Sequence, residues 1–94
     1  MAIVSIRHRG LRGLFEEGST RGVPVQQAQK LENMLHAIDQ AQTIEEIEVF
    51  PGWRLHPLAG NLDGYWSLTV TGNLRLIFRF SDGEAEDLDL IDYH

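Results

Sequence analysis

Three alternating segments joined by two tight turn sequences occupy the second half of the chain, and this pattern constrains the fold most. The segments are residues 65–71, 74–80 and 85–91. The joints, Gly72-Asn73 and Ser81-Asp82-Gly83, carry residues that hairpin turns favour. In the middle segment the residues of one face are apolar: Leu74, Leu76, Phe78 and Phe80. The pattern predicts consecutive antiparallel strands with one buried face.

The first half of the chain shows helical spacing instead. Leu11, Leu14 and Phe15 recur at this spacing before Gly18, which predicts a short first helix. A second helix of about 18 residues is predicted from Pro24 onward, with one apolar stripe. The stripe consists of Ala28, Leu31, Leu35, Ile38 and either Ala41 or Gln42.

Shorter patterns complete the prediction. Ile3–Ile6 is a β candidate, and Thr43–Glu46 fits a capping box. Trp53–His56 alternates as a strand that Pro57 limits to a sheet edge or to its own end. An acidic stripe, Glu84 to Asp89, is interpreted as a solvated edge that discourages strand pairing. We expect an α+β fold: two N-terminal helices packed on a mostly antiparallel, twisted sheet of four to five strands.

Composition limits the class of protein. A chain of 94 residues predicts one domain, residues 1–94, and the absence of cysteine excludes disulfides and thiol catalysis. No apolar run approaches the roughly 20 residues of a membrane span, and residues 1–6 do not resemble a secretory signal. We therefore expect a cytoplasmic protein without a membrane partner.

Charge is distributed unevenly along the chain. Residues 1–30 hold five basic residues against two acidic ones, whereas residues 31–94 hold three against twelve, which gives the net charge of −6. This asymmetry permits a basic face on an acidic body. Ordinary solvated surface is the alternative interpretation, and for the N-terminal arginines individually it is the more common case.

The chain carries imidazole, guanidinium and carboxylate groups that can take part in catalysis. The candidates for a catalytic site are His56, Arg75, Asp92, Tyr93 and His94. Imidazoles or a carboxylate can transfer protons near neutral pH, and an arginine can hold a phosphodiester. A polar tail and a surface arginine are the alternative interpretations. No metal-ligand spacing or phosphate-binding loop is present, so we expect neither a metal nor a cofactor.

Five blocks of the chain form distinctive motifs: Arg54-Leu55-His56-Pro57-Leu58-x-Gly60-Asn61, Gly64-Tyr65-Trp66-Ser67-Leu68-x-Val70, Asn73-Leu74-Arg75-Leu76-Ile77-Phe78, Phe15-x-x-Gly18 and Asp92-Tyr93-His94. These blocks resemble the HigB-like toxins, the "plasmid maintenance system killer" family of the RelE/ParE superfamily. They cover essentially the whole chain. The blocks of the C-terminal half are the specific ones.

The resemblance implies a toxin of a type II toxin–antitoxin system that cleaves mRNA on the ribosome without a metal. It implies catalytic roles for His56, Asp92, Tyr93 and His94, with Arg75 steadying the scissile phosphate. Candidate RNA contacts are Arg54, Arg9 and Arg12. The implied partners are the bacterial ribosome, mRNA and a small helix-turn-helix antitoxin (HigA-like). Operator DNA would be bound only through this antitoxin.

Ala59 departs from the family pattern, because active relatives commonly carry a lysine there. Loss of one catalytic cation typically costs on the order of a hundredfold in rate. Attenuation, replacement by another residue such as Arg54, and an introduced change all remain open. An attenuated member would act mainly as a module that binds its antitoxin and tunes its operon. A third alternative, poisoning of a gyrase-like target, is disfavoured by the terminal Tyr93-His94.

Overall fold

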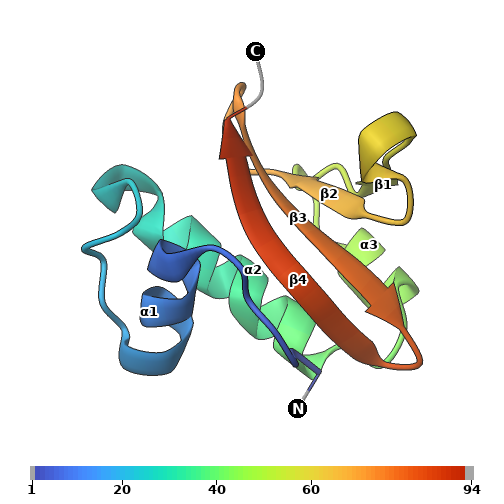
Figure 1. The fold of residues 1–94 in the computed structure, drawn as a ribbon, viewed down its shortest axis with the longest axis horizontal. Coiled ribbons are helices and arrows are strands. Elements are labelled where there is room, and N and C mark those ends of the chain that lie inside the picture. Colours follow the sequence, from blue (N-terminus) through green and yellow to red (C-terminus); the bar gives the residue numbers. More distant parts are fainter. Residues whose placement is uncertain (1, 93–94) are drawn as a thin grey trace.

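A four-stranded antiparallel sheet with the order β1-β2-β3-β4 lies at the centre of the structure (Figure 1). The structure is a computed structural model that describes residues 2–92. The strands are β1 (His56–Pro57), β2 (Trp66–Thr69), β3 (Leu74–Ser81) and β4 (Glu84–Asp92). The three hairpin-linked strands that the alternation predicts are thus confirmed, and β1 forms one edge of the sheet.

The β3–β4 hairpin is the longest feature of the sheet. Its turn consists of Asp82 and Gly83 with φ of 54° and 76°, and Ser81 pairs with Glu84. Positive φ at both turn residues matches the right-handed twist of the flanking strands. Further along, the register shifts between Ile77 and Arg79, and Asp87 on β4 has φ of 56°. Such a bulge increases the local twist of the hairpin.

Within residues 2–92, three α-helices and two 3-10 turns lie outside the sheet. They are α1 (Arg9–Glu17), η1 (Val25–Gln27), α2 (Ala28–Gln40), α3 (Glu45–Glu48) and η2 (Gly60–Leu62). Gly18, with φ of 72°, ends α1 as predicted. The predicted start of the second helix at Pro24 is wrong: Pro24 precedes η1, and α-helical geometry begins only at Ala28. A proline can start either kind of helix, so sequence does not distinguish them.

The helices cover one face of the sheet, as Figure 1 shows for α2 behind β4. The predicted stripe of α2 is buried and packs against the apolar face of β2, β3 and β4. Leu31, Ile38, Leu68, Leu76 and Phe78 are all fully buried in this core. Burying one such side chain stabilises the fold by about 1.5–3 kcal/mol. The α+β fold class is confirmed.

The N-terminal segment runs along the outer edge of β4. Ile3 and Ile6 form isolated parallel bridges with Ala85 and Leu88, so the predicted strand at 3–6 is reduced to two bridges. The backbone N–H of Arg7 also donates to Leu88 O at 2.7 Å. Since this edge is paired, the interpretation of the acidic stripe as a guard of a free edge is wrong. Only the tertiary fold brings residues 2–7 beside β4.

The predicted capping box at Thr43–Glu46 is not formed. The backbone N–H of Gln42 donates to the Glu46 carboxylate at 3.1 Å, whereas α3 is capped at Ile44 without a side-chain hydrogen bond. The brief helical turn itself is confirmed. Within residues 2–92 no helix has both the length and the apolar character needed to cross a membrane.

Candidate active site

A pocket of about 470 Å³ opens on the sheet face opposite the helices. One wall comes from β1 and η2, and the floor comes from the strands. It is lined by His56, Leu58, Ala59, Asn61, Leu62, Ser67, Arg75 and Ile91. Two of the candidate catalytic residues, His56 and Arg75, are therefore brought into one pocket by segments nearly twenty residues apart in the chain.

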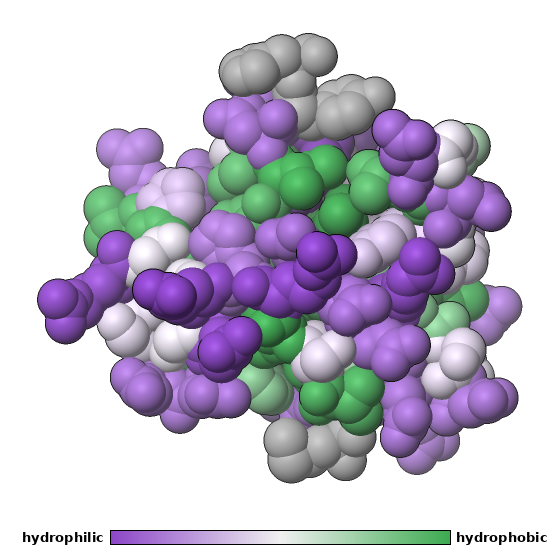
Figure 2. Space-filling model, viewed as in Figure 1, coloured by the Kyte–Doolittle hydropathy of each residue, from purple (hydrophilic) through white to green (hydrophobic). Residues whose placement is uncertain are grey.

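In Figure 1 the face of the sheet opposite α2 points toward the viewer. Figure 2 shows that this face carries a hydrophilic band across the middle. An apolar area lies above the band, toward the end of the sheet where β3 begins and β4 ends. Arg75 and Ile91, which are register partners near that end, both line the pocket.

His56 is positioned by the pairing of β1 with β2, in which it lies opposite Ser67. Its Nδ1 is 3.4 Å from the carbonyl oxygen of Arg54. A carbonyl can only accept, so this contact is a hydrogen bond only when Nδ1 carries the proton. In the neutral ring, Nε2 then keeps its lone pair. This tautomer is the one in which Nε2 can act as a general base.

The predicted strand at Trp53–His56 is present as an edge strand but is shorter than expected, and Arg54 is the reason. Its φ is 54°, in the left-handed region, so the extended conformation is interrupted and β1 contains only His56 and Pro57. The Arg54 side chain is exposed and is not part of the pocket lining. Its carbonyl, which faces the His56 ring, is the group through which it contacts the site.

Arg75 joins the pocket to the β2–β3 turn. Its Nη1 donates to the carbonyl oxygens of Thr71, Gly72 and Leu74 at 2.6, 3.1 and 3.3 Å. These contacts hold the guanidinium in a fixed place beside the pocket. The positive charge of Arg75 is thereby oriented before any anion is bound, which lowers the cost of stabilising a phosphate.

The other positions singled out in the sequence do not all line the pocket of His56 and Arg75. Ala59 lines the pocket and precedes η2, and its methyl side chain adds no charge there. Asp92 is exposed, lies opposite Leu74 and follows the pocket-lining Ile91, but is not itself in the lining. The predicted residues Tyr93 and His94 lie outside the described residues.

Arg9 and Arg12 lie elsewhere. They line a second cavity of about 730 Å³, which α1 forms with residues 19–22 and which also contains Glu16 and Glu17. Nη2 of Arg12 donates to the carbonyl oxygen of Ile6 at 3.0 Å. These two arginines therefore do not join His56 and Arg75 in one site, and the sequence offered no signal for this separation.

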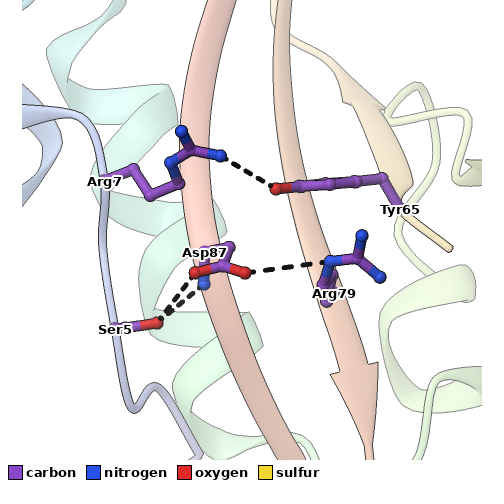
Figure 3. A network of polar contacts seen from close by, with 5 residues as sticks. All are labelled: Ser5, Arg7, Tyr65, Arg79 and Asp87. Atoms are coloured by element: carbon purple, nitrogen blue, oxygen red, sulfur yellow. Dashed lines mark hydrogen bonds and ion pairs between the residues drawn. The ribbon is translucent and has the colours of Figure 1, made fainter. Parts of the chain in front are cut away.

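A polar network crosses the same sheet face near the pocket (Figure 3). Arg7 Nη1 donates to the Tyr65 hydroxyl at 3.4 Å, and the Arg79 guanidinium lies 4.6 Å from the Tyr65 ring centroid. Arg79 also pairs with Asp87 at 3.8 Å, while the Ser5 hydroxyl accepts from the Asp87 N–H at 2.8 Å. The network links the N-terminal segment to β3, to β4 and to Tyr65, the residue that precedes β2.

The contact with Tyr65 raises the pKa of Arg7, with smaller contributions from Asp89 and Asp87. A raised pKa means that folding favours the charged guanidinium. This contribution is complete below the ordinary arginine pKa and is lost only as pH rises through the still higher folded value. The Arg7 contact therefore adds no pH dependence to stability near neutrality.

The sequence did not predict the pocket positions of Asn61 and Ser67 or the structural role of His8. Asn61 and Ser67 line the pocket, and Ser67, at 1% exposure, is the buried polar residue of the described part of the chain. His8, which lies between Arg7 and Arg9 in the sequence, caps α1, because its Nδ1 accepts from the Leu11 N–H at 3.1 Å. Among residues 2–92, no group of three or more His, Asp or Glu side chains could hold a metal ion.

The fold of the chain is shared with solved structures. It is similar to the YoeB-YefM complex from Staphylococcus aureus, with a TM-score of 0.61 and 17% identity over 100% of this chain and 97% of that chain. It is also similar to the YoeB/ParE toxin from Agrobacterium tumefaciens, with a TM-score of 0.59 and 19% identity over 100% and 99% of the two chains. The architecture is thus that of the YoeB and ParE toxins, a RelE-like fold.

The sequence defines the family within that class. Residues 4–94 match the model of the RelE-like toxin of type II toxin–antitoxin system HigB. The chain is 46% identical over 92 residues to Endoribonuclease HigB of Proteus vulgaris, covering 98% of this chain and 99% of the relative. It is 37% identical over 83 residues to Toxin HigB-1 of Vibrio cholerae, covering 87% of each. The chain belongs to the HigB family of toxins of type II toxin–antitoxin systems.

Proposed function

We propose that residues 1–94 form one toxin domain that cleaves mRNA on the ribosome. The observation that carries this proposal is the placement of His56 and Arg75 in one pocket. The similarity to Endoribonuclease HigB of Proteus vulgaris supports it independently. A base and a fixed cation on either side of a phosphodiester are the groups that metal-independent RNA cleavage requires.

In the proposed reaction, His56 Nε2 removes the proton of a ribose 2′-hydroxyl. The 2′-oxygen attacks the adjacent phosphorus, the bond to the 5′-oxygen breaks, and a 2′,3′-cyclic phosphate and a 5′-hydroxyl result. Arg75 stabilises the negative charge that grows on the phosphate oxygens. Asp92, Tyr93 and His94 would complete the site, with Asp92 or His94 returning a proton to the leaving oxygen. Arg54 is exposed beside the pocket and would contact the RNA backbone.

The proposed partners follow from the family. A helix-turn-helix antitoxin of HigA type would neutralise the toxin, and operator DNA would be bound only through that antitoxin. The ribosome would present the message. Arg9 and Arg12 could contact RNA only at a surface separate from the pocket, because they line the other cavity.

One observation favours a second candidate function. Ala59 gives the pocket an aliphatic surface where a lysine would offset phosphate charge. A weakly active toxin whose main role is to bind its antitoxin and regulate its operon would fit this pocket. The two candidates predict different rates of message cleavage rather than different folds.

A translating extract separates them. We expect the chain to cut message only when ribosomes are present, and Ala59→Lys to raise the rate by about a hundredfold, because it adds a cation beside the phosphate. Primer extension on the message measures cut sites and rates. His56→Ala is the inactive control. If the unchanged chain and Ala59→Lys both bind the antitoxin tightly and neither cleaves message, the ribonuclease proposal is refuted and the regulatory one is left.

A further inference from the structure

The one lysine of the chain, Lys30, connects α2 to the turn between β2 and β3. Its Nζ donates to the carbonyl oxygen of Val70 at 2.9 Å, across a separation of 40 residues in the sequence. Among residues 2–92 the Lys30 ammonium forms no ion pair with a carboxylate. A lysine that binds a partly buried backbone carbonyl restrains that backbone, because the carbonyl would otherwise lack a partner at a cost in free energy.

Packing places Lys30 at the margin of the core. Ala28 and Leu31, on either side of it in α2, are buried, and Val70, which follows β2, belongs to the same core. Lys30 itself is half-buried. This position suits a lysine, because its stem is apolar while its ammonium is polar.

The turn that Lys30 contacts is bonded internally. The backbone N–H groups of Val70 and Thr71 both donate to the Leu74 carbonyl oxygen, at 2.9 and 3.1 Å. The Thr71 hydroxyl oxygen accepts from the N–H groups of Asn73 and Leu74, at 3.3 and 3.0 Å. These bonds join residues 70–74 into one unit, so a displacement at Val70 also displaces the carbonyls that follow it.

The same turn holds Arg75 on the other face of the sheet. Three of its carbonyls, those of Thr71, Gly72 and Leu74, accept from Arg75 Nη1. Arg75 in turn lines the pocket. Two cations therefore bind one turn from opposite sides, Lys30 from the helices and Arg75 from the pocket.

We propose that Lys30 is a positioning residue for Arg75. By holding Val70 it fixes the turn, and the turn carbonyls fix the guanidinium beside the pocket. Misplacement of a catalytic group by about 1 Å can cost on the order of a hundredfold in rate, so a contact remote from the pocket can affect turnover. The effect on cleavage rests on the proposed function, whereas the effect on the guanidinium does not.

The first test observes the Arg75 guanidinium by NMR in the whole chain labelled with ¹⁵N-arginine. Arg75→Lys assigns its signals. We expect separate Nη–H signals for Arg75 in the unchanged chain, because rotation of the group is restrained, and merged or broadened signals in Lys30→Met. Lys30→Arg keeps a cationic donor and should restore the separate signals. The signals of Arg79, which contacts Asp87 and Tyr65, should be the same in all of these chains.

The second test measures cleavage with ribosomes programmed by message. Lys30→Met should lower kcat about tenfold and change KM by less than about threefold, because the turn acts on the reacting phosphate rather than on docking. Lys30→Arg should recover the rate. Gln29→Met introduces the same side chain at the exposed neighbouring position of α2 and should leave kcat unchanged. Thermal unfolding of each variant checks the fold.

Several results would overturn the inference. These are merged Arg75 signals already in the unchanged chain, unaltered signals in Lys30→Met, a loss that Lys30→Arg does not restore, or equal changes at Arg75 and Arg79. An unchanged kcat of Lys30→Met, in a chain that cleaves, would also contradict it.

The two tests fail separately. Altered Arg75 signals in Lys30→Met, in a chain that never cleaves message, would refute only the proposed function. Cleavage by the unchanged chain together with unaltered Arg75 signals in Lys30→Met would refute only this inference.

Discussion

His8 determines where α1 begins. Its backbone is extended, with φ of −78° and ψ of 121°, and its Nδ1 accepts from the Leu11 N–H. One of the four N–H groups that lack a partner at a helix start is therefore satisfied by an imidazole. The neighbouring arginines, Arg7 and Arg9, hide this role in the sequence because they suggest a basic patch.

Substitution of this cap should destabilise the protein. We expect His8→Ala to lower the free energy of unfolding by about 1 kcal/mol, because the Leu11 N–H loses its acceptor. Urea unfolding followed by circular dichroism measures the change. His8→Asn keeps a side-chain acceptor and should retain most of the stability. Equal losses in the two variants would show that the capping bond is not the cause.

The packing of α1 against the following loop depends on two glycines. A Cβ on Gly10 would lie 2.0 Å from the backbone oxygen of Gly22, and a Cβ on Gly22 would lie 2.5 Å from Gly10 Cα. Backbone atoms cannot move aside as a flexible side chain can. This close approach fixes the position of α1 relative to residues 18–24.

Two alanine substitutions in α1 should therefore have opposite effects. Gly10→Ala should lower the free energy of unfolding by about 2–3 kcal/mol, because the backbones must separate. Gly13→Ala is the matched control, since its nearest neighbour is Ser19 Cβ at 3.9 Å. It should raise stability by up to about 1 kcal/mol through helix propensity. Urea titrations of both variants measure the contrast, and a tolerated Gly10→Ala would contradict the backbone contact.

At the scale of the whole molecule, the two faces of the sheet have separate tasks. One face packs against the helices and forms the core, while the other carries the pocket and the Arg7–Tyr65–Arg79 network. Changes at the pocket can therefore alter chemistry without disturbing the core. The end of β4 extends beyond the last fully buried residue of that strand, Leu88.

Deletion of residues 92–94 tests this separation. We expect the free energy of unfolding to change by less than about 1 kcal/mol, because the exposed Asp92 lies outside the core. Antitoxin binding should persist and message cleavage should be lost. Urea unfolding, antitoxin titration and primer extension measure the three properties. Glu86→Gln, at an exposed site of β4, controls for the loss of one carboxylate. A deletion that abolishes cooperative unfolding would show that the segment is structural.

Much of this organisation follows from local patterns. Period-two alternation with turn residues identifies β2, β3 and β4, because side-chain direction along a strand is set by the backbone alone. The stripe from Ala28 to Ala41 likewise identifies α2. Local rules failed at Arg54, where a left-handed residue shortens the expected strand, and at Ile3–Ile6, whose pairing partner is some eighty residues away.

The sequence by itself determined the fold class, the family and two members of the candidate site, His56 and Arg75. Those results depend on spacing and on residue chemistry, which are properties of the chain. Only the tertiary structure decided that both residues line one pocket, that Arg9 and Arg12 line another, and that aliphatic side chains surround the first. These are relations between distant segments, and they exist only once the register of β1, β2, β3 and β4 is fixed by burial of the opposite face.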